Sequence, residues 1–283
     1  MTISCNAFAK VNLYLHVCAK RANGYHELDS LIAFAETGDR IMVSKASELT
    51  LSLTGPLASV LESEPDNLVL QAARALQELC SIRDGAAIVL EKHLPVAAGI
   101  GGGSGDAAAT LKALCQLWDV SPDPLALQRL ALTLGADVPI CLEGRAAHVG
   151  GIGEEISVRK VPNCWIVLVN SGVAVSTPSV FKARTGGFRA ANPMGEHIRF
   201  HHFIQALKKR HNDLMEPAIG LAPVIKTVLT VLQGQKGCAL SRMSGSGATC
   251  FALFENQNDA QNAKRRLEIE QASWWVAAAK LVC

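Results

Sequence analysis

The sequence of 283 residues lacks several patterns that would assign a function directly. It contains no Gly-Lys dipeptide, which excludes a Walker A nucleotide loop. His197, His201 and His202 are accompanied by neither HExxH nor spaced carboxylates, so a solvated helix face is expected there rather than a metal centre. The nine cysteines are scattered, with no two in a short spacing, and this excludes a disulfide framework or a zinc ribbon.

The sequence also has little excess charge. Lys plus Arg number 27 and Asp plus Glu 25, so the net charge of +2 gives no argument for nucleic acid or an anionic membrane. Residues 1–6 show no secretion signal, and the uncharged residues 161–181 contain Pro162 and Pro178, which favours a buried strand and a loop over a membrane helix. We expect a cytoplasmic protein with no nucleic-acid or membrane partner; no pattern indicates its oligomeric state.

Glycine, by contrast, is concentrated in residues 95–106, directly before an amphipathic helical pattern. Glycines let backbone N–H groups approach a ligand, and a helix start adds unpaired N–H groups and the positive end of the dipole, so phosphate is the natural occupant. Ser104 stands where the dinucleotide fingerprint needs its third glycine, so that fingerprint is not met. On the glycines alone, a tight strand-to-helix turn is an equal alternative. Ser104 or Asp106 is expected to cap the helix.

The first strong strand pattern covers residues 7–17, with Lys10 and Asn12 on the same face and about 7 Å apart. A solvated strand face is the alternative. The turn at Asn23-Gly24 is followed by Tyr25 and His26, which suits recognition of a planar base; a hairpin with a packed tyrosine is the alternative.

Further along, residues 29–56 predict short strands and loops, and a helix follows Asp66 or Asn67 as its cap. Lys92 ends a strand just before the glycine loop, where a surface lysine is the ordinary expectation. A second glycine-serine turn at residues 243–249 is expected to close around the first. The candidate boundary near residue 153 divides the chain into domains 1–153 and 154–283.

Asp137 lies before Val138-Pro139, a pattern typical of a helix start. A capping aspartate is one interpretation. The other is a carboxylate that faces a cleft, kept ionised by the helix terminus and able to accept a proton.

The order and spacing of these segments resemble the GHMP small-molecule kinase superfamily over nearly the whole chain. The resembling segments are residues 9–13, 21–28, 65–68, 95–109, 135–139, 212–214 and 243–247. Within the superfamily, Gly-Tyr-His-Glu-Leu beside Lys-x-Asn favours the family that phosphorylates 4-diphosphocytidyl-2-C-methyl-D-erythritol.

The resemblance implies a two-domain α/β fold of the α+β type with the active site in the interdomain cleft. It implies transfer of the γ-phosphate of ATP, with Mg²⁺ bridging the phosphates, to the C2 hydroxyl of this cytidyl diphosphate substrate, in the methylerythritol phosphate route to isoprenoid precursors. Asp137 would orient or deprotonate the hydroxyl, and Lys10 would keep Asp137 ionised and neutralise phosphoryl charge.

The resemblance also implies binding residues. Those on the ATP side are Asn67, Lys92, Pro95, Gly99, Gly101, Gly102, Gly103, Ser104 and Gly105. Those on the substrate side are Tyr25 and Phe181 around the cytosine, His26 at its polar edge, and Asn12 and Thr177 near the sugar alcohol and diphosphate. No residue is assigned to a metal.

Two positions depart from the family pattern: Gly105 replaces a usual second serine, and Met215 replaces a usual acidic residue. The alternatives are a GHMP kinase for mevalonate, homoserine or a sugar, and a nucleotide-binding regulator without turnover. A pocket for the cytosine base distinguishes the cytidyl-substrate kinase from the other GHMP kinases. The intact Lys10 and Asp137 argue against a regulator without turnover.

Overall fold

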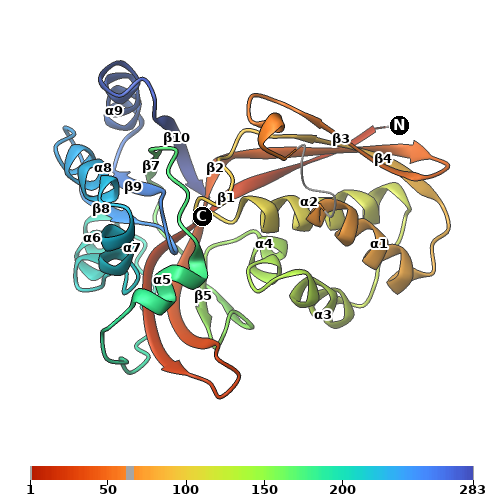
Figure 1. The fold of residues 1–283 in the computed structure, drawn as a ribbon, viewed down its shortest axis with the longest axis horizontal. Coiled ribbons are helices and arrows are strands. Elements are labelled where there is room, and N and C mark those ends of the chain that lie inside the picture. Colours follow the sequence, from red (N-terminus) through yellow and green to blue (C-terminus); the bar gives the residue numbers. More distant parts are fainter. Residues whose placement is uncertain (1, 62–66, 283) are drawn as a thin grey trace. The chain divides into compact units, whose positions relative to one another are not determined.

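The computed structural model describes residues 2–61 and 67–282, and its backbone forms two compact units (Figure 1). Unit 1 takes its described residues from 1–9, 38–96 and 101–144, and unit 2 from 10–37, 97–100 and 145–283. The units interleave along the chain because strands β1 (Thr2–Lys20) and β2 (His26–Ala46) contribute residues to both. The sequential division at residue 153 stays a prediction.

Unit 1 is a small sheet with helices on one face (Figure 1). Its elements, besides parts of β1 and β2, are β3 (Leu49–Thr54), the 3₁₀ turn η1 (Ala58–Leu61), α1 (Leu68–Cys80), β4 (Gly85–Glu91), α2 (Gly102–Leu117), α3 (Pro124–Leu134) and α4 (Val138–Glu143). β4 pairs antiparallel with the end of β2 and parallel with β3. The glycine loop therefore follows the central strand and leads into α2.

Unit 2 is a larger sheet whose strands run in the order β2-β10-β7-β9-β8, with neighbours antiparallel. Its elements are β5 (Ala147–Gly150), β6 (Glu155–Val158), β7 (Trp165–Asn170), α5 (Thr177–Ala183), α6 (Phe200–Lys208), α7 (Met215–Leu221), α8 (Val224–Gln233), β8 (Leu240–Met243), β9 (Cys250–Phe254), α9 (Gln257–Glu270) and β10 (Trp275–Val282). The apolar stripes of α8 and α9 share a core with β7 and β9. No described helix is long and apolar enough to cross a bilayer.

The predicted cap of the helix that follows residue 66 or 67 is confirmed. α1 begins after Asn67, whose side-chain oxygen accepts a hydrogen bond from the Val69 N–H at 2.9 Å. Pro65 and the other candidate cap, Asp66, lie outside the described residues. α3 ends at Gly135, and α5 begins with Pro178 in its first turn.

The prediction of short strands and loops over residues 29–56 is wrong up to Ala46, because β2 runs unbroken to that residue, and is confirmed beyond it by the short strand β3. The physical reason lies near its middle, where a Cβ on Gly38 would overlap the carbonyl of Ala7 on β1. Glycine thus marks a close approach of two backbones here, not the end of a strand.

We expect Gly38→Ala to lower the free energy of unfolding by about 1–3 kcal/mol, because the added methyl group forces a backbone shift. Urea denaturation measures this change. Gly220→Ala in α7 is the matched control, since a Cβ there meets open space. Equal unfolding midpoints for the two variants would contradict the assigned contact.

Candidate active site

The glycine loop enters α2 without a side-chain cap. The N-cap residue is Gly101, with φ at 64°, so Ser104 and Asp106 lie inside the helix and the prediction that either caps it is wrong. A helix start leaves its first N–H groups without intrahelical partners, and glycine has no side chain to accept from them. A Cβ on Gly103 would meet nothing within 4 Å. This helix start therefore has both the donors and the room for an anion.

The preceding part of the loop, residues 97–100, is held inside unit 2 by the second glycine-serine turn. The Ser244 hydroxyl donates to the Gly99 carbonyl at 2.9 Å, and the Thr249 N–H donates to Ala98 O at 3.1 Å. A Cβ on Gly99, where φ is 72°, would lie 2.7 Å from the carbonyl oxygens of Ser244 and Gly247. The predicted approach of the two turns is confirmed, and it explains why position 99 needs glycine.

Lys92 is only 2% exposed, so the expectation of a surface lysine is wrong. Its Nζ donates to Asp39 Oδ2 and, at 2.9 Å, to Asp106 Oδ2. The other oxygen of Asp39 accepts hydrogen bonds from the N–H groups of His93 and Leu94 at 2.6 and 2.8 Å. This Lys92 triad ties β2, the chain after β4 and the first turns of α2 together.

The Lys92 triad contains two carboxylates for one ammonium. Burial raises the pKa of Asp106 to about 7; the ammonium of Lys92 opposes the shift and the charge of Asp39 adds to it. Asp106 Oδ1 is buried and has no hydrogen-bond partner among the described residues. Asp106 is therefore a titrating group directly beneath the start of α2.

Lys10 and Asn12 are 4% and 3% exposed, so the alternative of a solvated strand face is wrong. Lys10 Nζ donates to Asn12 Oδ1 at 3.2 Å, and the Lys10 N–H donates to Ile100 O at 2.9 Å. The Asn12 N–H donates to the Ser244 hydroxyl at 3.1 Å. The strand whose backbone bonds to Ile100 of the glycine loop thus also carries a buried ammonium.

The predicted base-binding residues lie in unit 2. The turn at Asn23-Gly24 is confirmed, with φ at 89° for Gly24, and Tyr25 beyond it is 58% exposed. The His26 ring stacks on the Phe181 ring, with centroids 4.6 Å apart and planes 17° from parallel. Flat faces are therefore present, although Phe181 already has a stacking partner.

Two further features surround this stacked pair. Burial, followed by the charges of Lys20 and Arg184, lowers the pKa of His26, so its ring is neutral near pH 7 and presents one donor and one acceptor. The hydroxyls of Thr177 and Ser246 are hydrogen-bonded at 2.7 Å, which connects the start of α5 to the second glycine turn.

Asp137 occupies the N-cap position of α4, as predicted, yet its carboxylate makes no capping hydrogen bond. Capping alone therefore does not account for this residue. Pro139 lies in the first turn, where its missing N–H is harmless.

Sequence reasoning missed a buried polar cluster around Asp29, on β2 in unit 2. Its carboxylate accepts from the Tyr14 hydroxyl at 2.6 Å and the Asn192 N–H at 2.7 Å, and lies 3.0 Å from His148 Nε2. Burial acts to raise the pKa of Asp29, but the hydrogen bonds from His148, His16, Tyr14 and Asn192 outweigh it and hold the pKa far below its usual range. The available signal was an aspartate two residues before the apolar run at 31–35.

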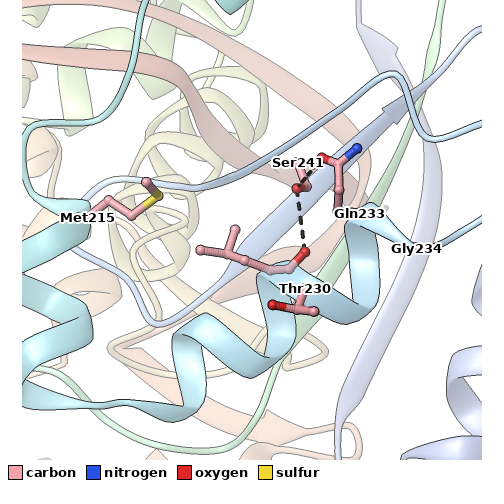
Figure 2. Close-up of a pocket in the computed structure, with 6 residues that line it drawn as sticks. Met215, Thr230, Gln233, Gly234 and Ser241 are labelled. Carbon is pink, nitrogen blue, oxygen red and sulfur yellow. Dashed lines mark hydrogen bonds between the residues drawn. The ribbon is translucent and has the colours of Figure 1, made fainter.

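A surface pocket of about 470 Å³ in unit 2 contains none of the predicted site residues (Figure 2). Its lining residues are Met215, Leu229, Thr230, Gln233, Gly234 and Ser241. The Ser241 hydroxyl bonds to Gln233 Oε1 at 3.0 Å, so polar atoms of the pocket satisfy one another. Met215, one of the two departures from the family pattern, therefore lines a surface pocket.

The solvated helix face predicted for the histidine-rich segment is confirmed in part. His201 and His202 lie exposed on α6, whereas His197 precedes the helix. Over residues 2–61 and 67–282, no group of three or more His, Cys, Asp or Glu side chains is placed to hold a metal ion.

Comparison with known proteins decides the family. The GHMP kinases N terminal domain matches residues 67–145, and the GHMP kinases C terminal domain matches residues 190–272. A 4-diphosphocytidyl-2-C-methyl-D-erythritol kinase of Rhodospirillum rubrum is 50% identical over 278 residues, covering 98% of this chain and 91% of that protein. The chain belongs to the 4-diphosphocytidyl-2-C-methyl-D-erythritol kinase family.

Two further comparisons agree with this membership. The kinase of the same name from Paramagnetospirillum magneticum is 49% identical over 283 residues and is covered over 99% of both chains. A crystal structure of 4-(cytidine 5'-diphospho)-2C-methyl-D-erythritol kinase superposes with a TM-score of 0.83 at 35% identity, covering 99% of each chain. The predicted two-domain GHMP kinase fold is confirmed.

Gly105, where a second serine is expected from the resemblance, has room for a side chain. Gly105 is buried in α2, and a Cβ there would point at β1, 3.6 Å from Ala7 Cβ and Phe8 O. The Cβ of a serine at this position would point at β1, whereas Ser104 beside it is partly exposed. A Cβ at position 105 would make only ordinary van der Waals contact with β1, and nothing in the structure explains the glycine there.

The structure brings some of the predicted kinase residues together within each unit. In unit 2 these are Lys10 with Asn12, and His26 with Phe181; in unit 1 Lys92 lies beneath Gly102, whose Cβ would be 3.2 Å from Lys92 Nζ. The proposed catalytic residues Lys10 and Asp137 belong to different units.

We expect Asp106→Asn to remove part of the pH dependence of stability in this kinase. The raised pKa of Asp106 means that the folded state retains a proton the unfolded state has lost. This contribution is complete below about pH 4 and is lost as pH rises through about 7. Thermal unfolding from pH 5.5 to 8 should therefore show a smaller decrease in Tm for the variant than for wild type.

The exposed Asp119→Asn is the control, because its carboxylate lies at the surface near the other end of α2. Its Tm profile should run parallel to that of wild type. A parallel profile for Asp106→Asn as well would contradict the assigned titration.

Proposed function

We propose that the chain phosphorylates the C2 hydroxyl of 4-diphosphocytidyl-2-C-methyl-D-erythritol with ATP, giving the 2-phosphate and ADP, in the methylerythritol phosphate route to isoprenoid precursors. The observation that carries this proposal is the near full-length similarity to kinases of that name. The buried ammonium of Lys10 and the uncapped glycine start of α2 suit phosphoryl transfer chemically.

In the proposed reaction, Asp137 accepts the proton of the attacking hydroxyl and Lys10 neutralises the charge that develops on the phosphoryl group. The loose transition state of phosphoryl transfer depends mainly on positioning and charge neutralisation, so a carboxylate is an adequate base. Asn12 supports Lys10 by accepting a hydrogen bond from its Nζ.

On the ATP side, we propose that residues 99–105 bind the phosphates and that Asn67, Lys92 and Pro95 complete the site. Lys92 is already engaged by Asp39 and Asp106, which supports a role in holding α2 for the nucleotide. Mg²⁺ usually keeps few protein ligands and binds through substrate phosphates. With no acidic cage among the described residues, ATP would supply most of its ligands, and the partly exposed Ser104 is the candidate protein ligand.

On the acceptor side, we propose that cytosine stacks with Tyr25 and Phe181 while His26 reads its polar edge. The neutral imidazole, with one donor and one acceptor, suits the polar edge of cytosine. Because His26 lies on Phe181, the base either takes the opposite face of that ring or displaces the imidazole. Asn12 and Thr177 are proposed to bind the sugar alcohol and diphosphate.

The cytoplasmic setting, with small molecules as the partners and no nucleic acid or membrane, also belongs to this proposal. It rests on the balanced charge and the scattered cysteines.

The reaction is tested by ADP release with Mg²⁺-ATP and a panel of alcohols. We expect turnover with the cytidyl alcohol and none with mevalonate or homoserine. Asp137→Asn should lower kcat by about 10²–10⁴-fold, because the amide cannot accept the proton.

Either of two results would contradict the assignment. Phosphorylation of mevalonate or homoserine but not of the cytidyl alcohol would contradict the substrate assignment. Unchanged turnover in Asp137→Asn would show that Asp137 is not the base. Asp123→Asn is a suitable control, since this aspartate caps the neighbouring helix α3 instead.

The base pocket is tested with Tyr25→Ala and Phe181→Ala. Loss of a stacking ring should raise KM for the cytidyl substrate by about 5–150-fold, as expected for about 1–3 kcal/mol per base, and leave KM for ATP unchanged. Tyr25→Phe keeps the ring and should retain most of the affinity. Equal effects on both substrates would refute the pocket assignment.

A further inference from the structure

Ser30 is a buried serine on β2 that no sequence motif marks, with 1% of its surface exposed. Its hydroxyl lies between two groups of β1. Ser30 Oγ donates to the Tyr14 carbonyl at 2.6 Å and accepts from Asn12 Nδ2 at 2.9 Å. Ser30 therefore contacts the side chain that supports Lys10.

The direction of these bonds follows from chemistry. A carbonyl oxygen only accepts, so the single hydroxyl proton of Ser30 is committed to Tyr14. The oxygen of Ser30 can then only accept from Asn12, and the amide must present its NH₂ group. The amide oxygen of Asn12 is thereby left facing Lys10 Nζ, 3.2 Å away.

The backbone of Asn12 is fixed in the same way, by a serine hydroxyl that donates one hydrogen bond and accepts another. The Ser244 hydroxyl commits its proton to the Gly99 carbonyl and accepts from the Asn12 N–H. With the strand held by Ser244, rotation of the amide group remains the main freedom of Asn12, and Ser30 removes it.

We propose that Ser30 is a positioning residue that fixes the amide orientation of Asn12, so that the Asn12 oxygen orients the Lys10 ammonium for phosphoryl transfer. In the flipped orientation, the NH₂ group would face the ammonium and repel it. This inference rests on the proposed function, because it assigns Ser30 a role in that reaction.

Ser30→Ala should lower kcat about five- to tenfold, as expected from the loss of one orienting hydrogen bond, with KM for ATP unchanged. Ser241→Ala is the matched control, because this hydroxyl also bonds to a carbonyl of unit 2 but lies in the pocket of Figure 2. Its kcat should equal that of wild type. A kcat for Ser30→Ala equal to wild type would overturn the inference.

A double-mutant cycle separates positioning from a merely structural role. If Ser30 acts through Asn12, Ser30→Ala should have no further effect on kcat in the Asn12→Ala background. The same fold-decrease in both backgrounds would overturn the inference, because it would show that Ser30 acts independently of Asn12.

A readout without turnover makes failure of the inference distinguishable from failure of the proposed function. In protein labelled with ¹⁵N-asparagine, the side-chain amide signals of Asn12 are assigned by their absence in Asn12→Ala. Hydrogen exchange of this amide should be slow in wild type and Ser241→Ala, and faster in Ser30→Ala.

Unchanged exchange in Ser30→Ala would overturn the orienting contact whatever the substrate. Accelerated exchange in a protein whose wild type does not phosphorylate the cytidyl alcohol would overturn the proposed function, and with it the catalytic role of Ser30.

Discussion

The polar arrangement of unit 2 depends on the hydroxyl of Ser244. It donates to Gly99 O at 2.9 Å and accepts from the Asn12 N–H at 3.1 Å, and so joins the first glycine segment, the second glycine turn and β1. Asn212 completes this junction by donating to the carbonyls of Met243 and Gly245 at 2.9 and 2.8 Å. Buried polar groups with all partners in place are rigid, because every alternative arrangement leaves a donor or an acceptor unpaired.

The two ends of the glycine loop are fixed by different chemistry. In unit 2, residues 97–100 are held by neutral hydrogen bonds and by backbone contact that only glycine allows. In unit 1, the start of α2 is held by the buried ion pairs of the Lys92 triad. Both arrangements leave the first N–H groups of α2 to a ligand, and such preorganised donors need no reorganisation when charge develops.

Local sequence rules predicted the elements that depend on near neighbours. Asn67 caps α1 through Val69, and Asn23-Gly24 forms a turn with φ at 89° for Gly24, because these features are decided within a few residues. The same rules misjudged β1, where the alternation of residues is real but both faces are buried. The partner that buries the Asn12 backbone is Ser244, 232 residues away in sequence, and no local pattern contains that contact.

The candidate site likewise contains residues that the sequence predicted and residues that it did not. Motif order predicted the family, because patterns such as Lys-x-Asn and the glycine loop are distinctive, while the catalytic roles of Lys10 and Asp137 stay predictions. Lys92 was expected at the surface because its two carboxylates, Asp39 and Asp106, come from separate segments. Ser30 and Asp29 were missed because isolated serines and aspartates occur everywhere, and only the fold shows what they contact.

Ser30 belongs to a chain of hydrogen bonds that begins at Lys10. Lys10 donates to Asn12, Asn12 to Ser30 and Ser30 to the carbonyl of Tyr14, whose own hydroxyl donates to the carboxylate of Asp29. The bond to Asp29 is separate from the others, because the Tyr14 hydroxyl is a different group from the Tyr14 carbonyl that accepts from Ser30. Since that carbonyl can only accept, it sets the direction of each bond back to Lys10, and so places the Asn12 oxygen against the ammonium.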